Sequence, residues 1–185
     1  MTTRATTKVS ITPAEAQDYR QVIERLAAGR ISQRIPNGVP AHASILLEAM
    51  FKHAQRDVRI YSGKLSADTY DQNELVMAAK RFLGRRGTRL RILLQEQEST
   101  VVERKFIQAL KSVDGACGEF ELRTATGVYA TDRAKHFAVM DECGYRFETN
   151  HEETKAVANF NEPPMAQELI SAFDRAFEIA THMTV

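Results

Sequence analysis

The strongest constraint on the fold is the alternation of strand and helix patterns in the middle of the chain. Residues 58–61 and 90–94 are short apolar-rich runs, typical of buried strands. A helical pattern that begins near Asp71 and ends at Gly84 lies between them, and another that begins at Ser99 precedes a third apolar run at residues 120–123. Strands separated by helices predict right-handed crossovers and a largely parallel sheet.

The last third of the chain has a different pattern. Residues 136–141 and 145–149 are strand-like runs separated by Glu142, Cys143 and Gly144, which predicts a hairpin. A further strand is expected at residues 154–160. A final helix, opened by two prolines, follows it. The prediction is therefore an α/β fold with a mixed, largely parallel sheet.

The N-terminal segment is predicted to be a helical appendage. Thr12, Pro13 and Glu15 form a capping pattern before a helix over residues 13–28. Residues 30–40 are rich in proline, asparagine and glycine and predict a connecting loop. We therefore expect an appendage at residues 1–40 and a domain at 41–185 that opens with a helix over 41–55. The appendage would cover its own domain or contact a partner protein.

Composition and residue spacing exclude several classes of function for this protein. The 25 basic and 24 acidic residues give a net charge of +1, which argues against a global electrostatic attraction to nucleic acid or an anionic membrane. Because no apolar run approaches the roughly 18 to 20 residues that span a bilayer, and the first ten residues lack a signal core, we expect a cytoplasmic protein without a membrane partner. No metal-ligand spacing and no complete phosphate loop occurs, so we expect neither a metal nor a cofactor.

The order of elements and two C-terminal segments resemble one half of the phospholipase D superfamily. The segments are HFAVMDECGYRFE and KAVANFNEPPMAQELISAFDRAFE, and the resemblance covers roughly residues 41–181. Leu169, Phe173 and Phe177 match the family's closing helix. The resemblance implies a bacterial-type phospholipase D-like domain that folds as a three-layer sandwich. It also implies a homodimer, which would bring two sites together.

The family's catalytic motif is degenerate in this chain. Counting back from Asp141, the family's histidine position falls on Ala134 and its lysine position on His136. The segment ETNHEE after the hairpin also lacks the family's glycine and serine. Phosphodiester transfer in the family depends on a histidine nucleophile and on lysine and asparagine donors, and alanine can supply neither function. The main hypothesis is a binding, regulatory or assembly module without catalysis.

An enzyme is the alternative hypothesis. His136 and His151 are the candidate catalytic residues of an altered phosphodiesterase or nuclease site formed by a homodimer. A serine nucleophile, Ser62 or Ser66, lacks an identifiable base, which favours a simple turn there. The residues expected to line the pocket besides the histidines are Tyr61, Ser62, Ala134, Thr149 and Asn150.

A cluster of basic residues raises a third hypothesis, a nucleic-acid-binding accessory protein. Six bases and no acid occur over twelve residues, and such a cluster can contact phosphates. Bases at a helix C-terminus also complement the helix dipole without any ligand, and Phe82 alone offers an aromatic ring. Nucleic acid is therefore not the favoured partner. The candidate phosphate-binding residues are Arg81, Arg85, Arg86, Arg89 and Arg91.

Overall fold

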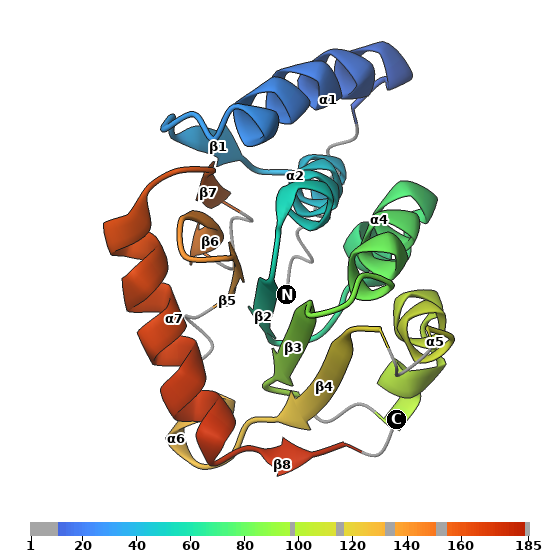
Figure 1. The fold of residues 1–185 in the computed structure, drawn as a ribbon, viewed down its shortest axis with the longest axis vertical. Helices are drawn as coiled ribbons and strands as arrows, with labels where there is room; N and C mark the ends of the chain where they lie inside the picture. The colour runs from blue at the N-terminus through green and yellow to red at the C-terminus, as the bar shows by residue number, and fades with distance from the viewer. Residues whose placement is uncertain (1–10, 97–98, 114–116, 132–135, 151–154, 184–185) are drawn as a thin grey trace, which may run out of the picture.

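An eight-stranded sheet with helices on both faces organises the protein (Figure 1). The computed structural model describes residues 11–96, 99–113, 117–131, 136–150 and 155–183. The strands are β1 (Ile35–Asn37), β2 (Asp57–Ser62), β3 (Arg89–Leu94), β4 (Glu119–Thr124), β5 (His136–Met140), β6 (Gly144–Asn150), β7 (Lys155–Asn159) and β8 (Thr181–His182). The helices are α1 (Pro13–Ala28), α2 (Pro40–His53), α3 (Ala67–Tyr70), α4 (Asn73–Leu83), the 3-10 helix η1 (Ser99–Glu103), α5 (Lys105–Lys111), α6 (Val128–Thr131) and α7 (Pro163–Glu178).

The sheet is mixed, as the sequence predicts. The strand order is β1-β7-β6-β5-β2-β3-β4-β8. Parallel pairing is confined to β2 with β3 and β3 with β4, which is two of the seven pairings among the described strands. The parallel share is thus smaller than predicted, because the β5–β6 hairpin and β7 return antiparallel and the short strands β1 and β8 add antiparallel edges.

Apolar side chains fill both faces of the sheet and give three layers. Helices α2, α4 and α5 lie on one side of the sheet in Figure 1 and α7 lies on the other. Alternation along β2 places Ile60 in the core under α2, whereas Tyr61 belongs to the cluster around α7. Phe173 of α7 is fully buried in this second cluster. The fold is therefore the α/β three-layer sandwich that was expected.

The N-terminal segment contributes to the main core. Ile23 and Leu26 of α1 are buried in the same cluster as the residues of α2. Arg20 donates to Glu48 of α2 at 3.0 Å, and Lys52 contacts the same carboxylate at 2.7 Å. Figure 1 shows α1 lying across α2 and β1. The division of the chain at residue 40 stays a prediction about domain organisation, and the structure places the two parts in contact.

Several short elements lie where loops or longer helices were expected. Strand β1 occupies the predicted connector and pairs with β7, and β8 pairs with β4 at the opposite edge. Helices α3 and α6 have four residues each. The helix expected from Ser99 is divided, because η1 ends at Glu103 and α5 begins at Lys105. Elements this short depend on tertiary pairing more than on local propensity.

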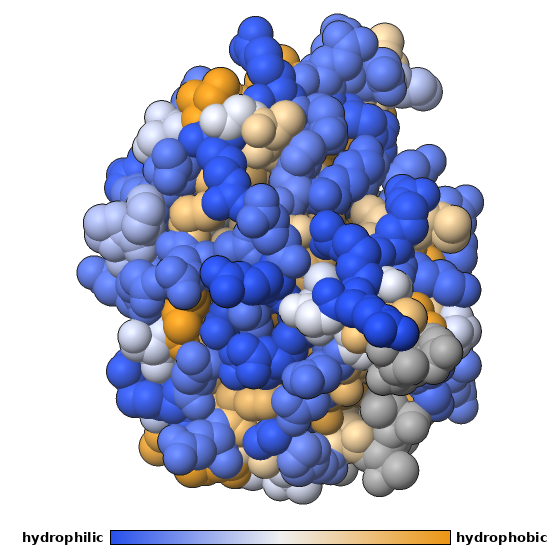
Figure 2. All heavy atoms as spheres, viewed as in Figure 1, coloured by the Kyte–Doolittle hydropathy of each residue, from blue (hydrophilic) through white to orange (hydrophobic). Residues whose placement is uncertain are grey.

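The surface offers little contiguous apolar area on the face shown in Figure 2, where hydrophilic side chains dominate and the apolar patches are small and separate. Among the described helices, none combines the length and apolar character required to cross a bilayer.

Candidate functional site

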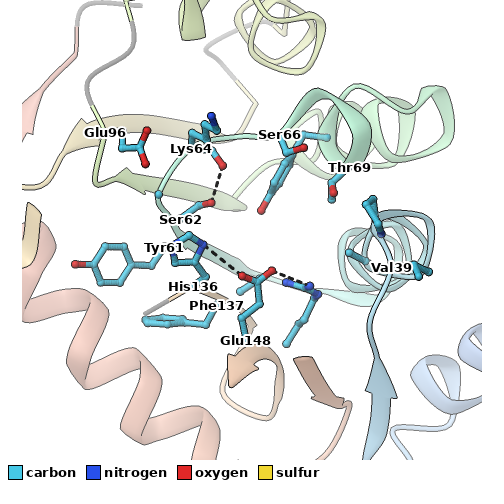
Figure 3. Close-up of a pocket in the computed structure, with 16 residues that line it drawn as sticks. Val39, Tyr61, Ser62, Lys64, Ser66, Thr69, Glu96, His136, Phe137 and Glu148 are labelled. Atoms are coloured by element: carbon cyan, nitrogen blue, oxygen red, sulfur yellow. Dashed lines mark hydrogen bonds and ion pairs between the residues drawn. The ribbon is translucent and has the colours of Figure 1, made fainter. Parts of the chain in front are cut away.

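The candidate site lies where β2 ends beside the first residue of β5. Phe137 of β5 pairs with Tyr61 of β2, so His136 comes next to Ser62 at the carboxyl end of β2. A cavity of about 240 Å³ opens at this point (Figure 3). Ligands of open α/β sheets commonly bind at this edge. The side chains discussed below that line it are Ser62, Lys64, Ser66, Thr69, Tyr70, Glu96, His136, Arg146 and Glu148.

A chain of polar contacts runs along one wall of the cavity. His136 and Glu148 are cross-strand partners on β5 and β6, and His136 Nδ1 lies 3.4 Å from Glu148 Oε2. Arg146 Nη2 donates to Glu148 Oε1 at 3.0 Å. Only 8% of His136 and 9% of Arg146 is exposed. The carboxylate of Glu148 therefore neutralises a buried guanidinium and pairs with the imidazole when that ring is protonated.

Small neighbours make room for these side chains. Ala138 is opposite Arg146 on β5, and Ala158 is opposite Arg146 on β7. Ala156 of β7 pairs with Glu148 on one side and with Asn37 of β1 on the other. The amide oxygen of Asn37 accepts from Arg146 Nε at 3.1 Å across this row of alanines. The edge strand β1 thus helps to fix the guanidinium of Arg146.

Gly63 lies directly against the imidazole of His136. A Cβ at this position would be 2.9 Å from His136 Cε1 and 3.1 Å from Nε2, closer than such atoms approach in folded proteins. Glycine therefore allows the chain that leaves β2 to pass beside the ring, and the ring is confined between this backbone and Glu148.

Two of the hydroxyl groups at the cavity donate to backbone carbonyl oxygens. Ser62 donates to the carbonyl oxygen of Lys64 at 2.8 Å, and Tyr61 donates to the carbonyl oxygen of Tyr129 at 2.8 Å. Burial raises the pKa of Tyr70, which keeps its phenol protonated at neutral pH. This geometry is consistent with a turn at Ser62, whose hydroxyl donates to a backbone carbonyl oxygen and makes no hydrogen bond to a basic side chain among the described residues.

The structure describes only part of the predicted pocket. Tyr61, Ser62 and His136 come together as expected. Ala134 and His151 lie outside the described residues, and for Thr149 and Asn150 only the backbone in β6 is described. The pairing of two histidines that the enzyme hypothesis requires therefore stays a prediction.

Three functional side chains were not identified from the sequence. Arg146 and Glu148 are separated by one residue on a predicted strand, so period-two alternation could have placed them on one face beside His136. Asn37 gave no comparable signal, because its contact with Arg146 joins residues 109 positions apart. No group of three or more potential metal-binding side chains comes together in the described part of the chain.

Asp141, which the resemblance to the phospholipase D superfamily matches to a motif aspartate, lies at the opposite end of β5 from His136. Its carboxylate accepts from the backbone N–H groups of Gln55, Arg56 and Asp57 at 2.9 to 3.2 Å. Arg30 Nη2 donates to the same carboxylate at 3.2 Å. Asp141 therefore ties the β5–β6 turn to the start of β2 and does not face the cavity.

The basic cluster is divided between several elements. On β3, Arg89 Nε donates to Asp57 at 2.9 Å, and Arg91 Nη1 donates to Asp174 of α7 at 3.1 Å. Burial raises the pKa of Asp57, but the hydrogen bond from Arg89 and the nearby arginine charges outweigh it, so that pKa lies below its usual value. Arg85 donates to the carbonyl oxygen of Ala54 at 2.7 Å. Arg81 and Arg86 remain exposed.

The architecture and the position of the cavity define a phospholipase D-like fold, and comparison with solved structures bears this out. Nuc from Salmonella typhimurium, a phospholipase D family member, is 15% identical, has a TM-score of 0.57 and aligns over 83% of this chain and 100% of its own. NucT from Helicobacter pylori is 10% identical, with a TM-score of 0.59 over 82% of this chain and 99% of its own. At such identities the likeness concerns the fold.

Further comparisons place the chain in a family. It belongs to a family described as a domain of unknown function, DUF7931, which matches residues 40–184. No curated protein matches the sequence. TrmBL2, an archaeal chromatin protein described as showing a novel mode of DNA binding, is 15% identical with a TM-score of 0.59. That alignment covers 92% of this chain and 63% of TrmBL2.

Proposed function

We propose that this protein is a catalytically degenerate phospholipase D-like domain that acts as a binding, regulatory or assembly module. The observation that supports this proposal is the carboxylate of Glu148, held between the imidazole of His136 and the guanidinium of Arg146. His136 stands at the position where the resemblance places a lysine that donates to phosphoryl oxygens. Here His136 lies against the carboxylate of Glu148, which belongs to the same chain.

Electrostatics explains why this arrangement disfavours phosphodiester transfer. Two like unit charges about 4 Å apart repel by roughly 4 kcal/mol at an effective dielectric constant of 20. A phosphodiester placed against His136 and Arg146 would meet the negative charge of Glu148 at such a distance. Arg146 and His136 are already in contact with Glu148, so they cannot stabilise a pentavalent transition state while this carboxylate stays in place.

The activity test uses a chromogenic phosphodiester, plasmid DNA and RNA. We expect the full chain to release product no faster than the His136→Ala variant with each substrate. A phosphodiesterase of known activity on each substrate provides a positive control for the assay conditions. Turnover that disappears in both His136→Ala and His151→Ala would contradict the proposal and support the altered histidine site.

We also propose that the module is a homodimer, as its resemblance to phospholipase D-like proteins implies. The expected mass in solution is twice the 20.8 kDa of one chain. Sedimentation equilibrium over a range of protein concentrations measures this mass directly. A mass of 20.8 kDa at every concentration would contradict the dimer without affecting the expectation for activity.

A further inference from the structure

We propose that the cavity is a binding site for a small oxyanion and that Glu148 closes it from within. This inference rests on the proposed function, because it assigns a ligand class and a form of regulation to the same non-catalytic cavity. Its starting point is that Glu148 already presents an oxyanion to two buried nitrogen donors, Arg146 Nη2 and His136 Nδ1. An external anion that replaced this carboxylate would meet the same donors.

Each cationic residue has a second anchor that does not involve Glu148. Arg146 is held through its Nε by the amide oxygen of Asn37 at 3.1 Å. His136 is confined by the backbone of Gly63. Both side chains would therefore keep their positions if the carboxylate moved away. The donors are preorganised, which lowers the cost of binding a replacement anion.

Glu148 is the partner that can be displaced. Its side chain is 19% exposed, whereas the side chains of Arg146 and His136 are 11% and 10% exposed. Figure 3 shows Glu148 beside His136 at the cavity, and Arg146 contacts the other carboxylate oxygen of Glu148. Glu148 lies on the cavity wall and has three rotatable bonds, so a ligand that takes over its contacts with Arg146 and His136 can displace the carboxylate without moving strand β6.

The chemistry of the donors identifies the ligand class. A guanidinium and an imidazole favour oxygen anions, and the planar fork of arginine suits phosphate and carboxylate groups in particular. The cavity of about 240 Å³ has the size for phosphate or a small phosphate monoester, not for a nucleic-acid duplex. Lys64 adds a positive charge to the lining and Glu96 adds a negative one. We therefore assign the cavity to a small oxyanion, with phosphate as the probe.

The experiment removes the closing carboxylate and measures phosphate binding. Isothermal titration calorimetry of Glu148→Gln with inorganic phosphate is expected to give an affinity roughly tenfold or more above that of the wild type. Phosphate should also raise the melting temperature of this variant more than that of the wild type. A parallel titration with acetate distinguishes a phosphate site from a general carboxylate site.

Matched variants separate this mechanism from a simple change in net charge. Glu96→Gln removes the same charge from the same cavity without freeing Arg146 or His136, so it should bind phosphate as the wild type does. Adding His136→Ala to Glu148→Gln should abolish the gain. Equal gains in Glu96→Gln and Glu148→Gln, or no gain in either variant, would overturn the proposal.

A second substitution at position 148 distinguishes a loss of phosphate binding from a folding defect. Glu148→Thr removes the carboxylate and introduces a β-branched residue that suits a strand, and circular dichroism checks that both variants are folded. Failure of phosphate binding in folded Glu148→Thr overturns the inference but leaves the expected lack of turnover intact. Turnover by the wild-type chain would instead overturn the proposed function, whatever the outcome of the phosphate titration.

Discussion

Replacing Asp141 with alanine is expected to lower the free energy of unfolding by about 3 kcal/mol. The substitution removes the acceptor of three backbone N–H groups at the start of β2 and the partner of Arg30. Asp141 also has a φ of 49°, a left-handed conformation that aspartate tolerates better than alanine. The loss of charged hydrogen bonds and the backbone strain act in the same direction.

Urea denaturation followed by circular dichroism measures this change. Asp141→Asn keeps the tolerance for positive φ and one acceptor oxygen, so it should lose clearly less stability than Asp141→Ala. Glu142→Ala changes the exposed neighbouring carboxylate and should shift the free energy by no more than about 0.5 kcal/mol. Equal stability of Asp141→Ala and the wild type would show that solvent replaces the carboxylate at this turn.

The contacts of Asp141 show that a residue at a position of a family's catalytic motif can have a structural role. The sequence placed this residue in a degenerate catalytic motif, and the structure gives it hydrogen bonds that hold the β5–β6 turn against β2. These contacts of Asp141 are structural, and none of them involves the position of the family's histidine. The presence of Asp141 in the sequence therefore says little about catalysis.

The fold was predictable where a pattern is local and repeated. The apolar runs that became β2, β3 and β4 lie between helices with clear periodicity. The predicted hairpin forms as β5 and β6, although Gly144, expected in the turn, is the first residue of β6. Strand β1 was not predictable, because its three residues include a proline and become a strand by pairing with β7, more than a hundred positions away. The two-residue strand β8 depends in the same way on β4.

The site was predictable only in part, for a related reason. His136 followed from its distance to Asp141 in the sequence, and Ser62 from the end of an expected strand. The partner of His136 was missed because Glu148 is its cross-strand neighbour, and such a pairing depends on the register of the hairpin. Arg91 shows how a local run can differ from its surroundings in the fold. It belongs to a basic run in the sequence, but its side chain is 12% exposed and paired with Asp174 under α7.

Replacing Arg146 with methionine is expected to lower the free energy of unfolding by about 3 to 5 kcal/mol. Methionine fills much of the volume but leaves Glu148 without its guanidinium partner and Asn37 without its donor. Breaking a buried ion pair by removing one member is costly, because the remaining carboxylate either stays poorly solvated or turns toward solvent and loses its contact with His136. The same urea titration measures this loss, with thermal unfolding as a second readout.

A double-mutant cycle tests the cause of that loss. Adding Glu148→Gln to Arg146→Met removes the carboxylate that has lost its guanidinium partner. The double variant should therefore be more stable, by about 0.5 to 3 kcal/mol, than the sum of the two single losses predicts. Arg34→Met is the matched control: its ion pair with Glu162 lies on the surface, with the arginine side chain 73% exposed, and its loss should leave stability almost unchanged. Additive losses at Arg146 and Glu148 would mean that the two side chains contribute independently. The closed cavity would then be held by packing around β6 and not by the charge pair.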